Sequence, residues 1–331
     1  MRRMRSQTSI ERTQWHPKRV RSRNEKSETM KIPHRIVDAH LHLYDYRQNR
    51  HAFLEQADPG YEAFIGNDER LPRRYLLNDY LADIRDHNVD AVVWHEFLSS
   101  DPRREAEWAQ RLAAASGLRH ALVAQVDFLD PNLEQVLERY AALPRVTAVR
   151  EHLVWDQANP LRRFAKRPDL MRDPAWRSKL RLLNGHRFKC GLEVFAPQLP
   201  DLIRVIRSYP DMGFTVALMG WPLDLGRDGY ANWKRSLADL AACENICVDI
   251  SALECIFGMR WSVDQVYPWV AATLETVGVS RCMFGSHMPI SGLATGFPEL
   301  YERYGRLIDT CSDAEIDELF FGVANRWFKP A

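Results

Sequence analysis

Ile36-Val37-Asp38-Ala39-His40-Leu41-His42-Leu43 is an apolar, β-branched stretch that leads into two histidines two positions apart. In a strand this spacing points both imidazoles to the same face, about 6.5 Å apart along the backbone, so both can reach one ion. If the strand is the first of a parallel barrel, that face is the interior, and the C-terminal end of the strand is where such barrels place their chemistry. Asp38 lies deeper on the same face, and we predict that it orients one of the two imidazoles. The alternative is a pair of histidines on a surface strand.

Seven further apolar, β-rich runs follow this stretch and alternate with segments of helical pattern. The eight predicted strands cover residues 36–43, 90–97, 119–127, 146–154, 188–195, 214–220, 245–251 and 281–286. The predicted helices cover residues 74–87, 103–115, 133–143, 176–184, 198–209, 230–242, 263–277 and 312–328. The last of these helices opens with the capping box Ser312-Asp-Ala-Glu315.

Eight β–α units in about 300 residues predict a (β/α)8 TIM barrel. A doubly wound open sheet is the alternative, but no Gly-rich phosphate loop follows the first strand. Two connections, Tyr44–Pro72 and Asp156–Asp173, are much longer than a usual turn and carry aromatic and charged residues. We expect them to fold over the barrel mouth as lids. For the basic cluster at residues 162–167, a solvated surface excursion is the alternative.

The chain has 331 residues, 46% of them hydrophobic and 27% charged, as in an ordinary globular protein. Residues 1–33 carry ten Lys/Arg against three Asp/Glu and have little apolar content. We interpret them as a basic disordered leader, with a nucleic-acid-binding arm and an organellar transit peptide as alternatives. Met30 just before the first strand also fits a later translation start. Residues 34–331 are predicted to form a single barrel domain.

No apolar run approaches the ~18–20 residues that a transmembrane helix needs, and the N-terminus lacks the apolar region of a secretory signal. We therefore expect a cytoplasmic protein with neither a membrane nor a nucleic-acid partner. The six cysteines include no C-x-x-C pair, and we expect them to be reduced and structural. For a barrel of this size we expect a homodimer, or a hetero-oligomer with a related barrel.

Several short motifs, in order along residues 34–329, resemble the amidohydrolase-related (amidohydrolase 2) family, in the branch that includes fuconolactonase and pyrone-dicarboxylate lactonase. They are Val37-Asp-Ala-His-Leu-His42, Val149-Arg150 with His152-Leu153 and Trp155, Arg167-Pro-Asp-Leu-Met-Arg-Asp-Pro-Ala-Trp176, Gln198-Leu-Pro-Asp201, Gly220-Trp-Pro-Leu-Asp224, Met283-Phe-Gly-Ser286 and Pro289. The resemblance implies a TIM barrel of the metal-dependent hydrolase type. In such a barrel a cation, or an electropositive substitute, polarises a carbonyl while a carboxylate activates water.

The resemblance does not carry over every site residue. His40 and His42 match the metal-binding pair of the first strand. The family's sixth-strand histidine falls at Met219, whose thioether is a poor ligand for a borderline or hard divalent cation. The family's eighth-strand aspartate falls at His287, whose imidazole can serve as ligand or proton acceptor.

Three hypotheses about function follow. In the first, His40, His42 and His287 bind a divalent metal, for which Zn²⁺ is the expected ion. Glu193 or Asp249 is then the general base. In the second, no metal binds, and Arg150 with the mouth histidines polarises a lactone carbonyl. In the third, the barrel is not a hydrolase but a redirected enzyme, such as a metal-dependent oxygenase, or a catalytically silent subunit. The first two make the protein a hydrolase of a small carboxylated lactone or a cyclic ester or amide.

Arg150 is the predicted contact for a substrate carboxylate or lactone oxygen, because an arginine inside a barrel needs an anionic partner. An ion pair with Glu193 or Asp127 is the alternative. In the triplet Trp94-His95-Glu96, either His95 or the other two can point inward. The predicted substrate-binding residues are Arg150, His152, Trp155, Tyr44 and His95.

Overall fold

The computed structural model describes residues 35–56, 58–65, 71–85 and 87–331. The predicted leader, residues 1–33, lies outside these ranges. Within them, no helix combines the length and the apolar composition that crossing a bilayer requires.

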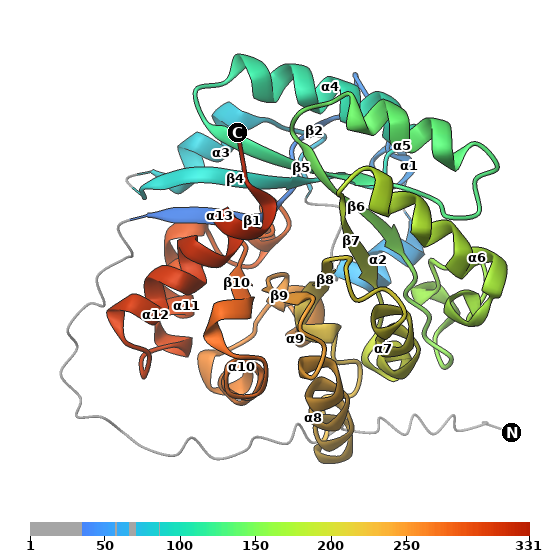
Figure 1. The fold of residues 1–331 in the computed structure, drawn as a ribbon. Coiled ribbons are helices and arrows are strands. Elements are labelled where there is room, and N and C mark those ends of the chain that lie inside the picture. Colours follow the sequence, from blue (N-terminus) through green and yellow to red (C-terminus); the bar gives the residue numbers. More distant parts are fainter. Residues whose placement is uncertain (1–34, 57, 66–70, 86) are drawn as a thin grey trace, which may run out of the picture.

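Eight parallel strands form one sheet that curves round on itself, with the strand order β1-β4-β5-β6-β7-β8-β9-β10 (Figure 1). Their bounds are β1 Ile36–Leu41, β4 Val89–His95, β5 Arg119–Gln125, β6 Val146–His152, β7 Lys189–Glu193, β8 Phe214–Val216, β9 Ile246–Ile250 and β10 Cys282–Phe284. A small antiparallel pair, β2 Tyr44–Asp45 and β3 Arg74–Tyr75, lies outside the barrel sheet. The predicted (β/α)8 TIM barrel is confirmed.

The two ends of the sheet meet just beyond β10. The backbone N–H of His287 donates to the His40 carbonyl at 2.6 Å, and that of His42 donates to the Met288 carbonyl at 2.8 Å. Gly285 allows this close approach, because a Cβ there would lie 2.5 Å from the His40 backbone nitrogen. The closure therefore fixes the two histidines of β1 beside the residue that follows β10.

Asp38 takes part in the closure rather than in imidazole orientation. Its carboxylate accepts the backbone N–H of Ser286 at 2.6 Å and the hydroxyl of Tyr80 at 2.9 Å. Burial raises its pKa to about 6, against these hydrogen bonds, which lower it. The prediction that Asp38 orients an imidazole is wrong, because the carboxylate next to the ring of His40 comes from β9 instead.

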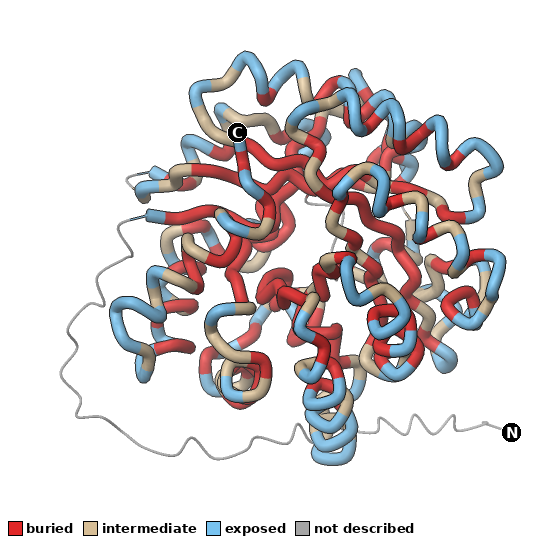
Figure 2. The backbone as a smooth tube through the Cα atoms, in the orientation of Figure 1, coloured by how far each residue is buried: buried red, intermediate tan, exposed pale blue. Residues whose placement is uncertain are grey.

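Helices surround the strands and are buried on the side that faces them (Figures 1 and 2). Their bounds are α1 Ala52–Glu55, α2 Pro59–Ile65, α3 Leu77–Ile84, α4 Pro102–Ala115, α5 Leu133–Ala141, α6 Pro174–Lys179, α7 Leu199–Arg207, α8 Arg227–Ala241, α9 Leu253–Phe257, α10 Val263–Val277, α11 Phe297–Leu307, α12 Asp313–Asp317 and α13 Val323–Phe328. The predicted bounds of α10 are confirmed. The predicted capping box is also present, with Ser312 and Glu315 bonded to each other's backbone N–H.

Helices α1, α2, α9 and α11 were not predicted from the sequence. Three of them are shorter than eight residues, too short for a helical period to stand out. The predicted closing helix is divided, because a π-helical turn at Glu318–Gly322 separates α12 from α13.

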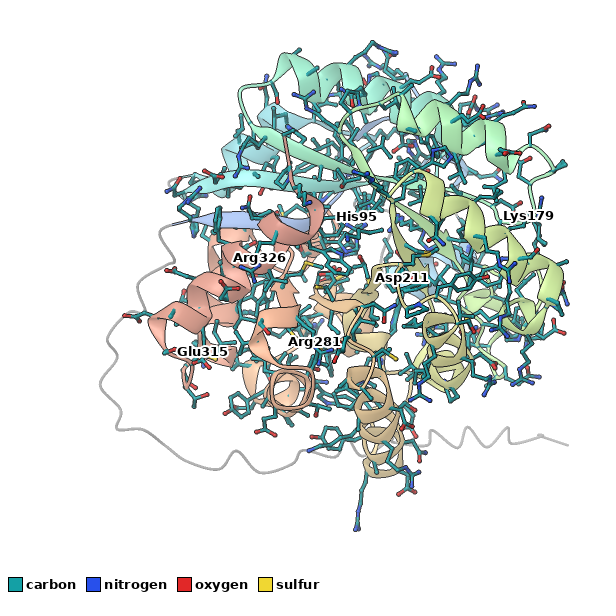
Figure 3. The ribbon with its side chains drawn as sticks, viewed as in Figure 1. His95, Lys179, Asp211, Arg281, Glu315 and Arg326 are labelled. Atoms are coloured by element: carbon teal, nitrogen blue, oxygen red, sulfur yellow. The ribbon has the colours of Figure 1, made fainter. Side chains whose placement is uncertain are left out.

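The core contains large aromatic side chains. The six cysteines are free thiols, as predicted. Trp94 points outward from β4 and packs against Trp108 of α4, with ring centroids 5.4 Å apart. Its neighbour His95 therefore points inward, toward the inside of the ring of strands in Figure 3.

Candidate active site

Three imidazoles meet at the C-terminal end of the barrel. His40 and His42 come from the end of β1, and His287 follows β10. One ring nitrogen from each lies within 4.8 Å of the others, and all three residues are buried. The ring centroids are 5.1 to 5.2 Å apart. The described residues thus bring together all three predicted metal ligands.

Each of the three rings is held through its Nδ1 atom. Nδ1 of His40 lies 2.7 Å from Oδ2 of Asp249, and Nδ1 of His287 lies 2.6 Å from Oε1 of Glu254. Nδ1 of His42 lies 3.0 Å from the carbonyl oxygen of His95. Carboxylate and carbonyl oxygens only accept, so each neutral ring carries its proton on Nδ1 and keeps a lone pair on Nε2.

The surroundings of His40 and His42 favour neutral imidazoles. Burial lowers the pKa of His40, although Asp249 opposes the effect, and burial lowers the pKa of His42 well below its ordinary value. Nε2 of His40 is buried and has no hydrogen-bond partner among the described residues. Buried lone pairs without donors are costly, and a cation bound between them would satisfy them. The donor set therefore fits a divalent metal such as zinc.

Met219, at the position where the resemblance places a histidine, is not among the described residues that line the cavity. After β8 the backbone turns left-handed, with φ angles of 51° at Leu218, 55° at Met219 and 42° at Trp221. Residues other than glycine rarely adopt such backbone angles. Backbone strain of this kind is typical of functional sites. All three side chains belong to the buried core, but Leu218 and Trp221 line the cavity and Met219 does not.

Arg150, Glu193 and His152 form a connected charged group beside the histidines. Nη1 of Arg150 donates to Oε1 of Glu193 at 2.7 Å, and Nδ1 of His152 lies 2.7 Å from Oε2 of the same carboxylate. Arg150 also donates to the backbone carbonyl of Glu96. Burial opposes ionisation of Glu193, but the Arg150 guanidinium and the hydrogen bond from His152 hold its pKa well below the ordinary value. The ion pair considered for Arg150 is therefore present with Glu193, while Asp127 pairs with Lys166.

Three predicted substrate-binding residues do not line the cavity. The Tyr44 hydroxyl donates to the Pro72 carbonyl at 2.7 Å, and its ring packs behind Phe97. His95 lies beneath the cluster, with its ring stacked on His40 at 3.9 Å. Trp155 is half-buried and pairs with the Arg163 guanidinium, 4.9 Å from the ring centroid.

Asp249, a predicted general base, is also not a lining residue of the cavity. Its carboxylate is hydrogen-bonded to His40 and to the hydroxyl of Ser251. The buried carboxylate that we missed is Glu254, in α9. It was the one charged residue in the apolar segment 252–258, which is the signal that could have revealed it.

The cavity above the histidines has a volume of about 410 Å³, counting its open mouth. Its lining residues are His40, His42, Tyr61, Phe64, Ile65, Phe97, Leu98, Arg150, His152, Glu193, Leu218, Trp221, Ala252, Cys255, His287 and Ile290. Cys255, expected to be purely structural, is therefore part of the cavity wall.

The first predicted lid contributes to this lining through α2, which supplies Tyr61, Phe64 and Ile65. The second predicted lid lines no part of the cavity among the described residues but supports α2 from outside. Phe164 packs on Phe64 with centroids 4.6 Å apart, and Nε of Arg162 donates to the Ala63 carbonyl at 3.0 Å.

Known proteins resemble this chain in sequence and in fold. An L-fucono-1,5-lactonase of Burkholderia multivorans is 25% identical over 88% of this chain and 95% of its own. An uncharacterized protein of Sinorhizobium fredii, y4mH, is 23% identical over 89% and 98%. A zinc-bound amidohydrolase structure from B. multivorans matches with a TM-score of 0.73 and 21% identity over 89% of this chain and 99% of that one. The Amidohydrolase family (Amidohydro_2) matches residues 37–329, and the chain therefore belongs to that family.

Proposed function

We propose that this protein is a metal-dependent hydrolase of a lactone or related cyclic ester, with the metal held by His40, His42 and His287. One observation carries the proposal: three buried imidazoles are locked by acceptors at Nδ1, so their Nε2 lone pairs are left for a common ligand. Imidazole suits zinc above the alkaline earths. The zinc in the related B. multivorans structure and the lactonase name of a relative support the same choice.

A divalent cation bound there would polarise the ester carbonyl and lower the pKa of a bound water. Asp249 and Glu254 hold the rings of His40 and His287 in the ligating orientation. Both carboxylates are committed to that task, so we do not assign either of them as the general base. Glu193 is also a poor base, because Arg150 and His152 stabilise its charged form.

We assign proton transfer to His152 instead. Its Nδ1 faces Glu193, its Nε2 has no hydrogen-bond partner in the part of the chain that the structure describes, and its side chain lines the cavity. A carboxylate behind an imidazole orients the ring and stabilises its protonated form. His152 would take a proton from water as the water oxygen bonds to the carbonyl carbon. The ring C–O bond then breaks, and the proton passes to the released alkoxide, giving a hydroxy acid.

Elemental analysis at known protein concentration tests the metal site. Protein grown with zinc, iron and manganese and purified without chelator should hold about one equivalent of a transition metal. His287→Ala should lose most of it, whereas His186→Ala, a histidine outside the cavity, should not. Less than half an equivalent in the wild type contradicts the proposal.

Kinetics then separate His152 from the ligands. In metal-loaded protein, His152→Ala should lower kcat for lactone hydrolysis by about 10²–10⁴-fold with unchanged metal content. Unchanged kcat would rule out the assigned role, and loss of metal would make His152 part of the metal site.

A further inference from the structure

The charge of Arg150 is already neutralised inside the protein. One nitrogen of its guanidinium is bonded to Glu193 at 2.7 Å, and another donates to a backbone carbonyl. It is the only Lys or Arg among the described residues that line the cavity. A substrate carboxylate would have to compete with Glu193, a buried anion in an ion pair. Among the described lining residues, no lysine or arginine side chain is therefore left unpaired for an anionic substrate.

The rest of the cavity wall is apolar. Above the histidines, α2 presents Phe64 and Ile65, and Phe64 packs on Trp221 with ring centroids 4.6 Å apart. The strand ends add Phe97 and Leu218, both nearly fully buried. Ile290, Ala252 and Leu98 continue the same surface.

Few polar atoms interrupt this wall. Outside the histidines, Arg150 and Glu193, the described lining side chains bear one hydroxyl, on Tyr61, and one thiol, on Cys255. A polyhydroxylated ring enclosed here would leave hydroxyls without partners after losing water. Each such hydroxyl would weaken binding by about tenfold.

We propose that the substrate is a neutral, largely apolar lactone, with an aromatic or alkyl body, rather than a sugar lactone or a dicarboxylate. This inference rests on the proposed hydrolase function and specifies its substrate class. The apolar body would lie against the surface formed by Phe64, Trp221 and Leu218, with the ester carbonyl toward the three histidines. Flat rings gain most from such a site, because aromatic walls add stacking to the burial of apolar area. The reaction remains hydrolysis, in which water cleaves the acyl C–O bond.

The test compares three cyclic esters on metal-loaded, full-length protein: dihydrocoumarin, D-glucono-1,5-lactone and 2-pyrone-4,6-dicarboxylate. All three have a six-membered lactone ring, but dihydrocoumarin releases a phenol, so each kcat/KM is divided by the rate constant for uncatalysed hydrolysis of the same ester. We expect the normalised kcat/KM for dihydrocoumarin to exceed the other two by about a hundredfold. Equal values, or a preference for the polyol or the dicarboxylate, would overturn the inference while leaving the hydrolase function intact.

A variant locates the preference in the apolar wall. Phe64→Ala should lower the ratio of kcat/KM for dihydrocoumarin over gluconolactone by about tenfold. Trp155→Ala removes an aromatic ring outside the cavity and should leave the ratio unchanged. An unchanged ratio in Phe64→Ala counts against the inference.

If none of the three esters is hydrolysed, a binding measurement still tests the apolar substrate class separately from the hydrolase function. Calorimetric titration with 1-tetralone, a bicyclic aromatic ketone, is compared with myo-inositol and with phthalate. Tighter binding of tetralone by about tenfold or more supports the apolar ligand class even though hydrolysis has failed. Absence of tetralone binding, or tighter binding of either polar probe, refutes it.

Discussion

Oε1 of Glu254 lies 2.6 Å from Nδ1 of His287, and both residues are buried. By resemblance, the amidohydrolase-related family has an aspartate at the position of His287. A neutral imidazole brings no charge of its own, but a carboxylate directly behind it gives the pair the charge that the aspartate would carry. We infer that Glu254 compensates for the change from aspartate to histidine.

Glu254→Gln should therefore weaken metal binding by about 10–100-fold, because the amide keeps the shape of the side chain but removes its charge. Competition with a chelator measures the affinity. Glu134→Gln, on the exposed face of α5, is the matched control. Equal affinities for the two variants would show that Glu254 does not support the metal site.

Met219→His should leave the metal content of the protein unchanged, although it restores a histidine at the position the resemblance marks. The Met219 side chain is buried in the core and does not line the cavity. A buried imidazole without a partner should instead lower the free energy of unfolding by about 1–3 kcal/mol. Urea denaturation and elemental analysis check both parts, and a gain in metal affinity would place this side chain in the cluster after all.

Arg150→Ala should destabilise the protein by about 3–5 kcal/mol, because it leaves the Glu193 carboxylate buried without its main partner. In a separate cycle of wild type, Arg150→Met, Glu193→Leu and the double variant, the double variant should lose clearly less stability than the sum of the two single variants. Chemical denaturation of the four proteins gives the coupling free energy. Additive effects would mean that the two side chains do not depend on each other.

Glu151 predicts a pH dependence of stability. Burial raises its pKa from 4.5 to about 8, although the Trp176 indole N–H donates to its carboxylate at 2.9 Å. Between these two values the folded protein binds a proton that the unfolded chain has released. The contribution of Glu151 to the free energy of unfolding is therefore full below pH 4.5 and falls as pH rises toward 8, by at most about 1.4 kcal/mol per pH unit.

Glu151→Gln mimics the protonated side chain and should remove this slope, so the variant gains stability relative to wild type as pH rises from 5 to 8. Urea denaturation at a series of pH values measures the difference. Glu134→Gln should show no such trend. Parallel curves for wild type and Glu151→Gln would mean that Glu151 is ionised in the folded state throughout this range.

The sequence by itself determined the barrel, because strand and helix periods are local properties of the chain. The spacing of His40 and His42 also placed both rings on one face of β1 before any tertiary information was available. For His287, the resemblance placed the residue at the end of the last strand, and the closure beyond β10 brings it to the first strand. These predictions were correct because the period of a strand fixes the face on which a side chain lies, and the closed order of strands in a barrel places the last strand beside the first.

Only the tertiary structure decided which side chains face one another across the mouth. The left-handed turn after β8 turns Leu218, and not Met219, to the cavity, and no local preference signals such angles in those residues. The pairing of Arg150 with Glu193 and of Glu254 with His287 joins elements that are distant in sequence. Such pairs depend on strand register and loop path, and these are set by packing of the whole barrel rather than by the residues nearby.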